Sequence, residues 1–350
     1  MKELIKIDLN KSLKYLLPNL DLLKGKTILI TGGTGFIGSW VARGLIWLND
    51  EHNFGCKIVI LARNPYKLEE IDSDLYNRND ISFIRADVRG LHSLPTDVNY
   101  IIHTVGNPDN RVHMSDPINT MDIIATGTKV LLENATRLEK LESIVCLSSG
   151  QVYEVFSENS NIYSQNMCEN FLRHDVKSIY PEAKRYSEIL CLAYKSLYKL
   201  PVIVVRPFSF IGPYQELKKP WAINSFLQEA LSNQTMRIIG NGKPKRSYLY
   251  ATDMVAWLLV ILVQGKKGET YNLGSSSAVS LLEITSKINN FLESKVNVSI
   301  QNYNDDESRF IPENKYVKDN FGLEEKFSFD EALEHTLKWN IANLLKEERR

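Results

Sequence analysis

Long apolar runs are missing from this sequence. No stretch approaches the roughly 20 apolar residues that an α-helix needs to cross a bilayer, so we expect no membrane partner. The first twenty residues, MKELIKIDLNKSLKYLLPNL, are charged throughout and lack the apolar block of a signal peptide. Residues 1–24 are therefore expected to form a helical extension that packs on the body of the protein.

Cysteine is scarce, and neither sign of charge is in excess. The cysteines show no paired or metal-type spacing, which predicts reduced thiols, no bound metal and a cytoplasmic protein. They are Cys56, Cys146, Cys168 and Cys191. The 42 basic residues equal the 42 acidic residues, so net charge gives no indication of a nucleic-acid partner.

Short β-rich runs alternate with helix-like patterns along the first two thirds of the chain. The runs are KTILITG, CKIVILAR, ISFIRADV, VNYIIHTVG, LESIVCLSS and LPVIVVRPFSFIGP. Helical patterns cover residues 37–47, 122–138 and 181–198. This alternation predicts βαβ units on a parallel sheet, and continuous apolar runs indicate strands covered on both faces.

A glycine motif lies between the first strand and the first helix pattern. Its spacing is Gly32-x-x-Gly35-x-x-Gly38. A tight turn, a close approach to a pyrophosphate and close helix–strand packing each exclude a Cβ, and the helix N-terminus offers free N–H groups to phosphates. A turn with only a packing role is the alternative. The context favours a dinucleotide site that includes Phe36 and Ile37.

These features predict a Rossmann-type α/β fold with a doubly wound parallel sheet, in a chain of 350 residues that can hold two coupled domains. Residues 25–205 are expected to form the dinucleotide-binding domain. Beyond Gly212, prolines and glycines break the chain into shorter elements. We expect residues 206–350 to form mainly a smaller α/β domain that covers the substrate, with some return to the sheet.

The end of the second predicted strand bears on the choice of cofactor. It reads ILARNP, with Arg63 and Asn64 where an acid usually binds the adenosine ribose. A guanidinium suits a 2′-phosphate, which favours NADP(H); if Arg63 only stacks on adenine, the cofactor is NAD(H). Asp87, followed by Val88, is expected either to accept a hydrogen bond from the adenine amine or to be an ordinary turn residue.

Three further residues carry reactive groups. Tyr180 and Lys184 are four residues apart, which places both on one face of a helix. A nearby ammonium is expected to lower the pKa of the phenol. Ser149 follows the fifth strand, at the sheet edge where open α/β folds bind ligands, and its hydroxyl could orient the phenol. Each residue alone is weak evidence of a catalytic site, whereas the three residues in this order are much more specific evidence than any one of them.

Residues 25–340 resemble the extended short-chain dehydrogenases of the nucleotide-sugar epimerase/dehydratase family. The resemblance rests on TGGTGFIG, SSGQVY, YPEAKR, RPFSFIGPY and GNGKPKRSYLYATD. It implies that Tyr180 is the general acid/base, Lys184 its partner and Ser149 the group that orients the hydroxyl. Hydride would then pass between a sugar carbon, usually C4, and the nicotinamide of the cofactor.

The resemblance also implies a partner and a substrate clamp. A homodimer would form through a four-helix bundle of the helices near residues 122–138 and 181–198. Arg246 matches an arginine that binds the pyrophosphate of the sugar nucleotide. We expect Arg206 to be structural or to bind substrate, and Asp253 to cap a helix.

Several positions depart from the family pattern. Gly150 and Gln151 stand where 4,6-dehydratases carry an acid and a base, and neither can exchange a proton usefully. Glu154 is either a displaced acid or a surface residue. Ser209 replaces a usual substrate-binding asparagine, and HTVG at residues 103–106 replaces His-x-Ala-Ala. We expect an altered site in which Gly150, Gln151 and Ser209 still face the substrate.

The departures favour a reductase of a 4-keto nucleotide sugar, which would consume NADPH. A C4 epimerase is the alternative and would show no net consumption. A 4,6-dehydratase, a decarboxylase and a non-catalytic dinucleotide sensor are disfavoured. The complete Ser149–Tyr180–Lys184 set argues against the sensor, because a sensor does not need all three groups.

Overall fold

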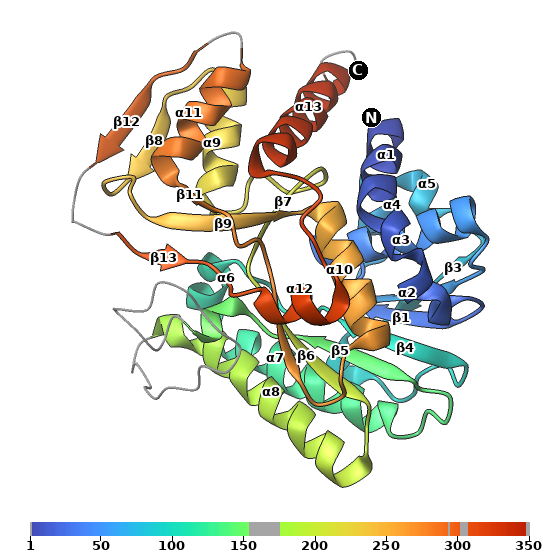
Figure 1. Ribbon diagram of the computed structural model, residues 1–350. Helices are drawn as coiled ribbons and strands as arrows, with labels where there is room; N and C mark the ends of the chain where they lie inside the picture. The colour runs from blue at the N-terminus through green and yellow to red at the C-terminus, as the bar shows by residue number, and fades with distance from the viewer. Residues whose placement is uncertain (1, 154–175, 293–294, 302–306, 348–350) are drawn as a thin grey trace.

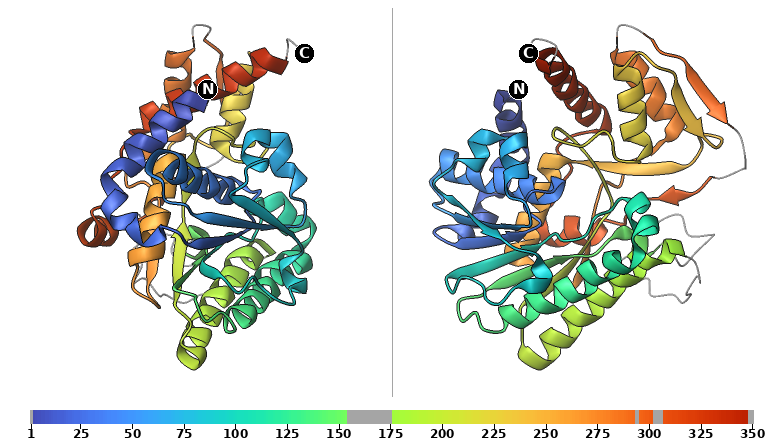
Figure 2. Two further views of the ribbon diagram at one scale, coloured as in Figure 1. Left: turned by 90° about the vertical axis from the view of Figure 1, so that its right-hand side faces the viewer. Right: turned by 180° about the vertical axis from the view of Figure 1, so that it is seen from behind.

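The computed structural model describes residues 2–153, 176–292, 295–301 and 307–347. Its largest element is a seven-stranded parallel sheet with helices on both faces (Figures 1 and 2). The strand order is β10-β6-β5-β4-β1-β2-β3. The strands are β1 (Thr27–Thr31), β2 (Lys57–Ala62), β3 (Ile81–Arg85), β4 (Val98–His103), β5 (Ser143–Leu147), β6 (Val202–Pro207) and β10 (Thr270–Leu273). This confirms the predicted Rossmann-type α/β fold.

The sheet lies between two apolar layers because successive side chains of a strand point to opposite faces. In β1, Ile28 and Ile30 pack with α3 and α10, whereas Leu29 packs with α7 and α8. The bounds of these helices are Phe36–His52 (α3), Pro117–Ala135 (α7), Ile179–Tyr198 (α8) and Ala251–Gln264 (α10). All five residues of β1 are buried, as expected for a strand covered on both sides.

Smaller elements lie beyond the carboxyl edge of the large sheet (Figure 1). In one small sheet β9 pairs with β7, β11 and β13, and in the other β8 pairs with β12. Their bounds are β7 (Ser209–Ile211), β8 (Met236–Ile239), β9 (Lys245–Tyr250), β11 (Ala278–Ser280), β12 (Val298–Gln301) and β13 (Arg309–Phe310), with helices α9 (Ala222–Leu231) and α11 (Leu281–Phe291). Between β9 and β11 the chain returns to the large sheet, where β10 pairs with β6. The predicted domain boundaries stay a prediction.

The N-terminal segment is a chain of short helices on the layer that holds α3 and α10. It consists of α1 (Lys2–Leu13), η1 (Lys14–Leu16), α2 (Leu17–Leu20) and η2 (Asp21–Leu23). Leu9, Leu13, Leu20 and Leu23 are buried in the same apolar cluster as Trp257 of α10. Since full burial of a leucine contributes about 1.5–3 kcal/mol, this segment is part of the core.

Asp253 does not cap a helix, so that expectation was wrong. It lies within the first turn of α10, whose N-cap residue is Tyr250, and it is fully buried. Its carboxylate accepts hydrogen bonds from the Ser12 hydroxyl (2.6 Å) and from the backbone N–H groups of Lys326 (2.9 Å) and Phe327 (3.1 Å). The side chain therefore joins α1, α10 and the segment before the last helix.

The remaining helices are α4 (Tyr66–Ile71), α5 (Ser73–Tyr76), α6 (Asn110–Ser115), α12 (Lys315–Phe321) and α13 (Phe329–Glu347). Among the described helices, none combines the length and apolar content needed to cross a membrane. Cys56, Cys146 and Cys191 are buried thiols outside any disulfide, and Cys168 lies outside the described residues. Within the described ranges, no three potential ligand residues gather as a metal site would require.

Candidate active site

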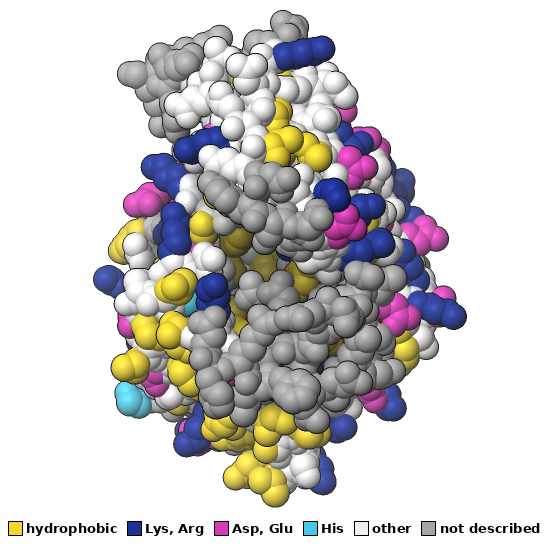
Figure 3. Space-filling model, turned by 90° about the vertical axis from the view of Figure 1, so that its left-hand side faces the viewer, with side chains coloured by type: hydrophobic (Ala, Val, Ile, Leu, Met, Phe, Trp, Pro, Cys, Tyr) yellow, Lys and Arg dark blue, Asp and Glu magenta, His cyan; other side chains and the backbone are white. Residues whose placement is uncertain are grey.

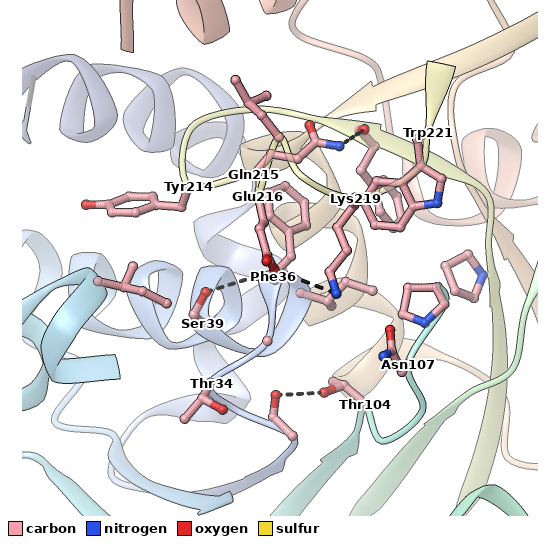
Figure 4. A pocket seen from close by; sticks show the side chains of 18 of the residues that line it. Thr34, Phe36, Ser39, Thr104, Asn107, Tyr214, Gln215, Glu216, Lys219 and Trp221 are labelled. Atoms are coloured by element: carbon pink, nitrogen blue, oxygen red, sulfur yellow. Dashed lines mark hydrogen bonds and ion pairs between the residues drawn. The ribbon is translucent and has the colours of Figure 1, made fainter. Parts of the chain in front are cut away.

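A cleft of about 1840 Å³ runs along the carboxyl edge of the large sheet, and Figure 4 shows part of its wall. Most residues predicted to form the site line it: Gly32, Gly35, Phe36, Ile37, Arg63, Asp87, Val88, Ser149, Gln151, Tyr180, Lys184, Ser209 and Arg246. Gly38, Asn64 and Gly150 are not among the lining residues. Folding thus brings segments far apart in the sequence to one cleft, at the edge where open α/β sheets bind ligands.

The glycine loop leaves no room for a side chain at two positions. A Cβ on Gly32, where φ is +70°, would lie 2.7 Å from Thr104 Oγ1. A Cβ on Gly38 would lie 2.7 Å from both Gly32 O and Gly33 Cα. Gly35 precedes the first residue of α3, so the free N–H groups of that helix face the cleft beside the loop. The arrangement fits a dinucleotide pyrophosphate.

The adenosine end of the expected site contains a charged cluster. Arg63 and Asn64 are exposed directly after β2. The Arg89 guanidinium donates to both carboxylate oxygens of Asp87 (3.0 and 2.8 Å) and also to Asp122 (2.6 Å). The hydrogen bonds from Arg89 lower the pKa of Asp87 to about 2. Sequence reasoning missed Arg89, although its position two residues after Asp87 indicates an ion pair between them.

Ser149, Tyr180 and Lys184 meet in the floor of the cleft. Their exposed fractions are 7%, 5% and 4%. Tyr180 lies in the first turn of α8 and Lys184 one turn later, while Ser149 follows β5 and forms a hydrogen bond with the phenol of Tyr180. Lys184 Nζ donates to the carbonyls of Val105 (3.0 Å) and Leu147 (2.8 Å).

The expected lowering of the phenol pKa by Lys184 was wrong. Burial raises the pKa of Tyr180 to about 12, and only the hydrogen bond with Ser149 acts in the opposite direction. The ammonium of Lys184 lies 5.8 Å from the centre of the Tyr180 ring and points to backbone carbonyls instead. Burial also lowers the pKa of Lys184 to about 8. Desolvation is therefore the largest cause of the pKa shift of both groups.

The altered HTVG segment has a steric explanation. Gly106 has a φ of +132°, and a Cβ there would lie 2.9 Å from Lys184 Nζ. The usual alanine would therefore crowd the ammonium and would be strained in this backbone conformation. Gly106 lets the loop after β4 pass close to Lys184.

Sequence reasoning missed His113, on α6. Its imidazole stacks on the phenol of Tyr180, with ring centroids 4.3 Å apart and planes 7° from parallel. No motif or spacing indicated this contact, because the stack depends on the path of the loop after β4.

Gln151, Ser209 and Arg246 also line the cleft. Arg246 Nη1 donates to Lys245 O (2.9 Å). Gly150 is set back, since a Cβ there would lie about 3 Å from the rings of Phe208 and Phe310. Phe208 and Phe310 themselves line the cleft, so the expectation that Gly150 faces the substrate stays a prediction.

The loop between β7 and α9 contributes lining residues that the sequence analysis did not single out: Tyr214, Gln215, Glu216, Lys219 and Trp221 (Figure 4). Lys219 lies 3.7 Å from the carboxylates of both Asp109 and Glu216. This lysine therefore bridges the loop after β4 and the loop after β7 across the cleft.

Arg206 is structural. Its guanidinium donates to both carboxylate oxygens of Glu188 (2.8 and 2.6 Å) and to the hydroxyl of Tyr153 (2.7 Å). Tyr153 in turn donates to Asn272 Oδ1 (2.9 Å). This buried network joins α8, β6 and β10, and Arg206 does not line the cleft.

The fold, the glycine loop and the buried serine, tyrosine and lysine define a protein of the short-chain dehydrogenase class. The family model described as NAD dependent epimerase/dehydratase family matches residues 28–274. The chain therefore belongs to that family.

Individual relatives agree with this assignment. Over 290 residues the chain is 31% identical to a dTDP-D-glucose 4,6-dehydratase of Dictyostelium discoideum, covering 78% of this chain and 63% of the relative. Over 336 residues it is 27% identical to a trifunctional UDP-glucose 4,6-dehydratase/UDP-4-keto-6-deoxy-D-glucose 3,5-epimerase/UDP-4-keto-L-rhamnose-reductase of Arabidopsis thaliana, covering 91% of this chain and 48% of the relative. The chain thus spans between about half and two thirds of the length of these two proteins.

One solved structure has a similar fold over nearly the whole length of this chain. It is a UDP-glucuronic acid 4-epimerase from Bacillus cereus in complex with UDP-glucuronic acid and NAD. The TM-score is 0.77 at 21% identity, and the alignment covers 91% of this chain and 99% of the other. At 21% identity, this structural similarity is evidence for the fold alone.

Proposed function

We propose that this protein is an NAD(P)-dependent oxidoreductase that transfers hydride at a sugar carbon, C4, of a nucleotide hexose. The observation that carries the proposal is the buried Ser149–Tyr180–Lys184 cluster, which lines the same cleft as the glycine loop. The relatives named above act on sugars linked to UDP or dTDP. Arg246, which lines the same cleft, is the group we propose for the pyrophosphate of such a substrate.

The glycine loop, Arg63 and Val88 would hold the dinucleotide, because the loop is a cradle that a Cβ would fill. When bound, a nicotinamide dinucleotide supplies or accepts the hydride. As the carbonyl carbon of the sugar gains hydride, Tyr180 transfers its phenol proton to the carbonyl oxygen. Ser149 orients both oxygens by hydrogen bonding. Lys184, one helical turn after Tyr180, would hold the ribose next to the nicotinamide of the cofactor.

Reduction of a 4-keto sugar is the direction we favour. With a pKa of about 12, Tyr180 carries its proton at neutral pH and is ready to act as an acid. Gly150 lies against aromatic rings and Gln151 cannot exchange a proton usefully, so neither supplies the acid or base that 4,6-dehydration requires. Glu154, the possible displaced acid, lies outside the described residues. A C4 epimerase stays the alternative.

We also propose NADP(H) as the preferred cofactor. Arg63 is exposed, lines the cleft directly after β2 and replaces the usual ribose-binding acid. A guanidinium at this position can pair with a 2′-phosphate. NAD(H) is the alternative, and the solved Bacillus cereus relative contains NAD.

We further propose a homodimer formed through α7 and α8. Tyr186, Ile189 and Leu197 are 52%, 59% and 74% exposed on one face of α8, and Ile118 of α7 is 82% exposed. Figure 3 shows hydrophobic side chains gathered in the lower part of the side where α8 lies. A second copy would cover this apolar face, because a two-fold axis brings the same helices together.

The proposal is tested by incubating the protein with nucleotide hexoses and their 4-keto derivatives while following the absorbance of the reduced nicotinamide. A reductase consumes NADPH with a 4-keto sugar, whereas an epimerase interconverts two sugars without net consumption. Tyr180→Phe should lower kcat by about 10²–10⁴-fold and leave cofactor affinity unchanged. Full turnover in this variant would overturn the proposed role of Tyr180.

A further inference from the structure

The imidazole of His113 lies flat against the phenol proposed to exchange the proton. The centroids are 4.3 Å apart, the planes differ by 7°, and the exposed fractions of His113 and Tyr180 are 4% and 5%. Tyr180 lines the cleft, whereas His113 is absent from the described lining residues. The imidazole therefore contacts the phenol from outside the space that a substrate would occupy.

The loop before α6 fixes the plane of this imidazole. His113 Nε2 is 2.5 Å from Asn107 O, and because a carbonyl oxygen only accepts, Nε2 carries the proton. The side chain of Asn107 accepts from the backbone N–H of Asp109 (3.1 Å). Asp109 in turn caps α6 by accepting from Arg111 N–H (3.0 Å). These contacts hold the ring rigidly between the loop and Tyr180.

The surroundings of His113 keep the imidazole neutral at pH 7. Burial lowers its pKa most, and Lys184 acts in the same direction, while the Asn107 carbonyl and Asp109 act in the opposite direction. A neutral ring places no charge beside the phenol, so His113 acts on Tyr180 through contact.

We propose that His113 is a positioning residue that holds the ring plane of Tyr180, and with it the direction of the O–H bond, which lies in that plane, toward Ser149 and the reacting carbonyl. This inference rests on the proposed function of Tyr180. The torsion that turns a phenol ring has broad minima, and the hydrogen bond with Ser149 restrains only the oxygen atom. The stacked imidazole supplies the missing restraint on the plane.

Three substitutions of His113 distinguish the effect of ring stacking from the effect of the Nε2 hydrogen bond. His113→Phe keeps a flat ring without the Nε2 donor, His113→Gln keeps a donor without a ring, and His113→Ala has neither. We expect kcat to fall by about 10–100-fold in His113→Ala and His113→Gln, with KM and cofactor affinity within about 2-fold, because misplacement by about 1 Å can cost about 10²-fold. His113→Phe should recover most of the rate.

The exposed His92 gives a matched control, since His92→Ala should leave all constants unchanged. The inference is overturned if His113→Phe is as slow as His113→Ala, or if KM rises as much as kcat falls. Wild-type protein that turns over no nucleotide sugar would instead refute the proposed function.

A second measurement does not depend on turnover. The protein has six histidines, and the proton NMR signals of the His113 ring can be assigned by their loss in His113→Phe. Stacking predicts that these signals lie upfield in the wild type and move downfield in Tyr180→Leu. Signals at ordinary positions, unchanged in Tyr180→Leu, would show that the rings do not stack in solution and would overturn the inference.

Discussion

At the scale of single residues, Gly38 is a position where both the packing of the loop and the dinucleotide site require glycine. A Cβ there would lie 2.7 Å from two backbone atoms, Gly32 O and Gly33 Cα, and neither can move without shifting the loop. Gly38→Ala should therefore destabilise the protein by about 1–3 kcal/mol and weaken dinucleotide binding. Denaturant unfolding and a cofactor titration measure both effects.

Gly90 provides the control for this prediction. A Cβ on Gly90 meets nothing within 4 Å, so Gly90→Ala should bind the dinucleotide as the wild type does. If Gly38→Ala also bound it normally, the loop would not require a bare backbone at this position.

Arg63 is the residue on which the choice between the two cofactors depends. Its guanidinium is exposed and lines the cleft. If it pairs with the 2′-phosphate, Arg63→Ala should weaken NADP(H) binding by about 10–100-fold, because a hydrogen bond to a charged group contributes about 1.5–3 kcal/mol. NAD(H) binding should change little, and titration by nicotinamide fluorescence measures both affinities.

The exposed Arg85 is the matched control, because it does not line the cleft. Arg85→Ala should leave the ratio of the two affinities unchanged. Equal losses for NADP(H) and NAD(H) in Arg63→Ala would instead support adenine stacking.

At the scale of secondary-structure elements, Asp253 links the N-terminal helices to α10, and burial raises the pKa of its carboxyl from 3.8 to about 7. The folded state then binds a proton that the unfolded state releases above about pH 4. The contribution of Asp253 to stability is therefore fully present below about pH 4 and is lost as pH rises toward 7, by up to about 1.4 kcal/mol per pH unit. Asp253→Asn should flatten this slope between pH 5 and 7.

Chemical unfolding at several pH values measures the slope. Asp330 has a side chain that is 65% exposed, so Asp330→Asn should retain the wild-type slope. Identical slopes in Asp253→Asn and the wild type would show that Asp253 does not titrate on unfolding in this range.

The elements of the large sheet were mostly predictable, and their ends were less so. The run LPVIVVRPFSFIGP predicted one strand, but the structure divides it into β6, which ends at Pro207, and β7, which begins at Ser209. β6 pairs with β5 and β10, while β7 leaves the sheet to pair with β9. Helix α7 begins at Pro117, before the predicted start at residue 122. Proline at the first helical position suits a helix N-terminus.

At the scale of the whole molecule, the exposed apolar face of α7 and α8 predicts the oligomeric state. Ile189→Glu would place a charge in the centre of the proposed interface, so it should convert a dimer into a monomer. Ile239 of β8 is 77% exposed on another part of the molecule, and Ile239→Glu should leave the dimer intact. Sedimentation at micromolar concentration distinguishes the two states.

A wild-type protein that sediments as a monomer at these concentrations would refute the proposed dimer. A dimer that persists in Ile189→Glu would place the interface on another surface.

The sequence by itself determined the sheet, the glycine loop and the residue types of the Ser149–Tyr180–Lys184 cluster. Hydrophobic period, glycine spacing and the four-residue separation on a helix are local properties, which a linear pattern records. Only the tertiary structure decided the burial that keeps Tyr180 protonated, the stack of His113 and the place of Lys219 across the cleft. These depend on desolvation and on contacts between loops distant in sequence, for which no local pattern exists.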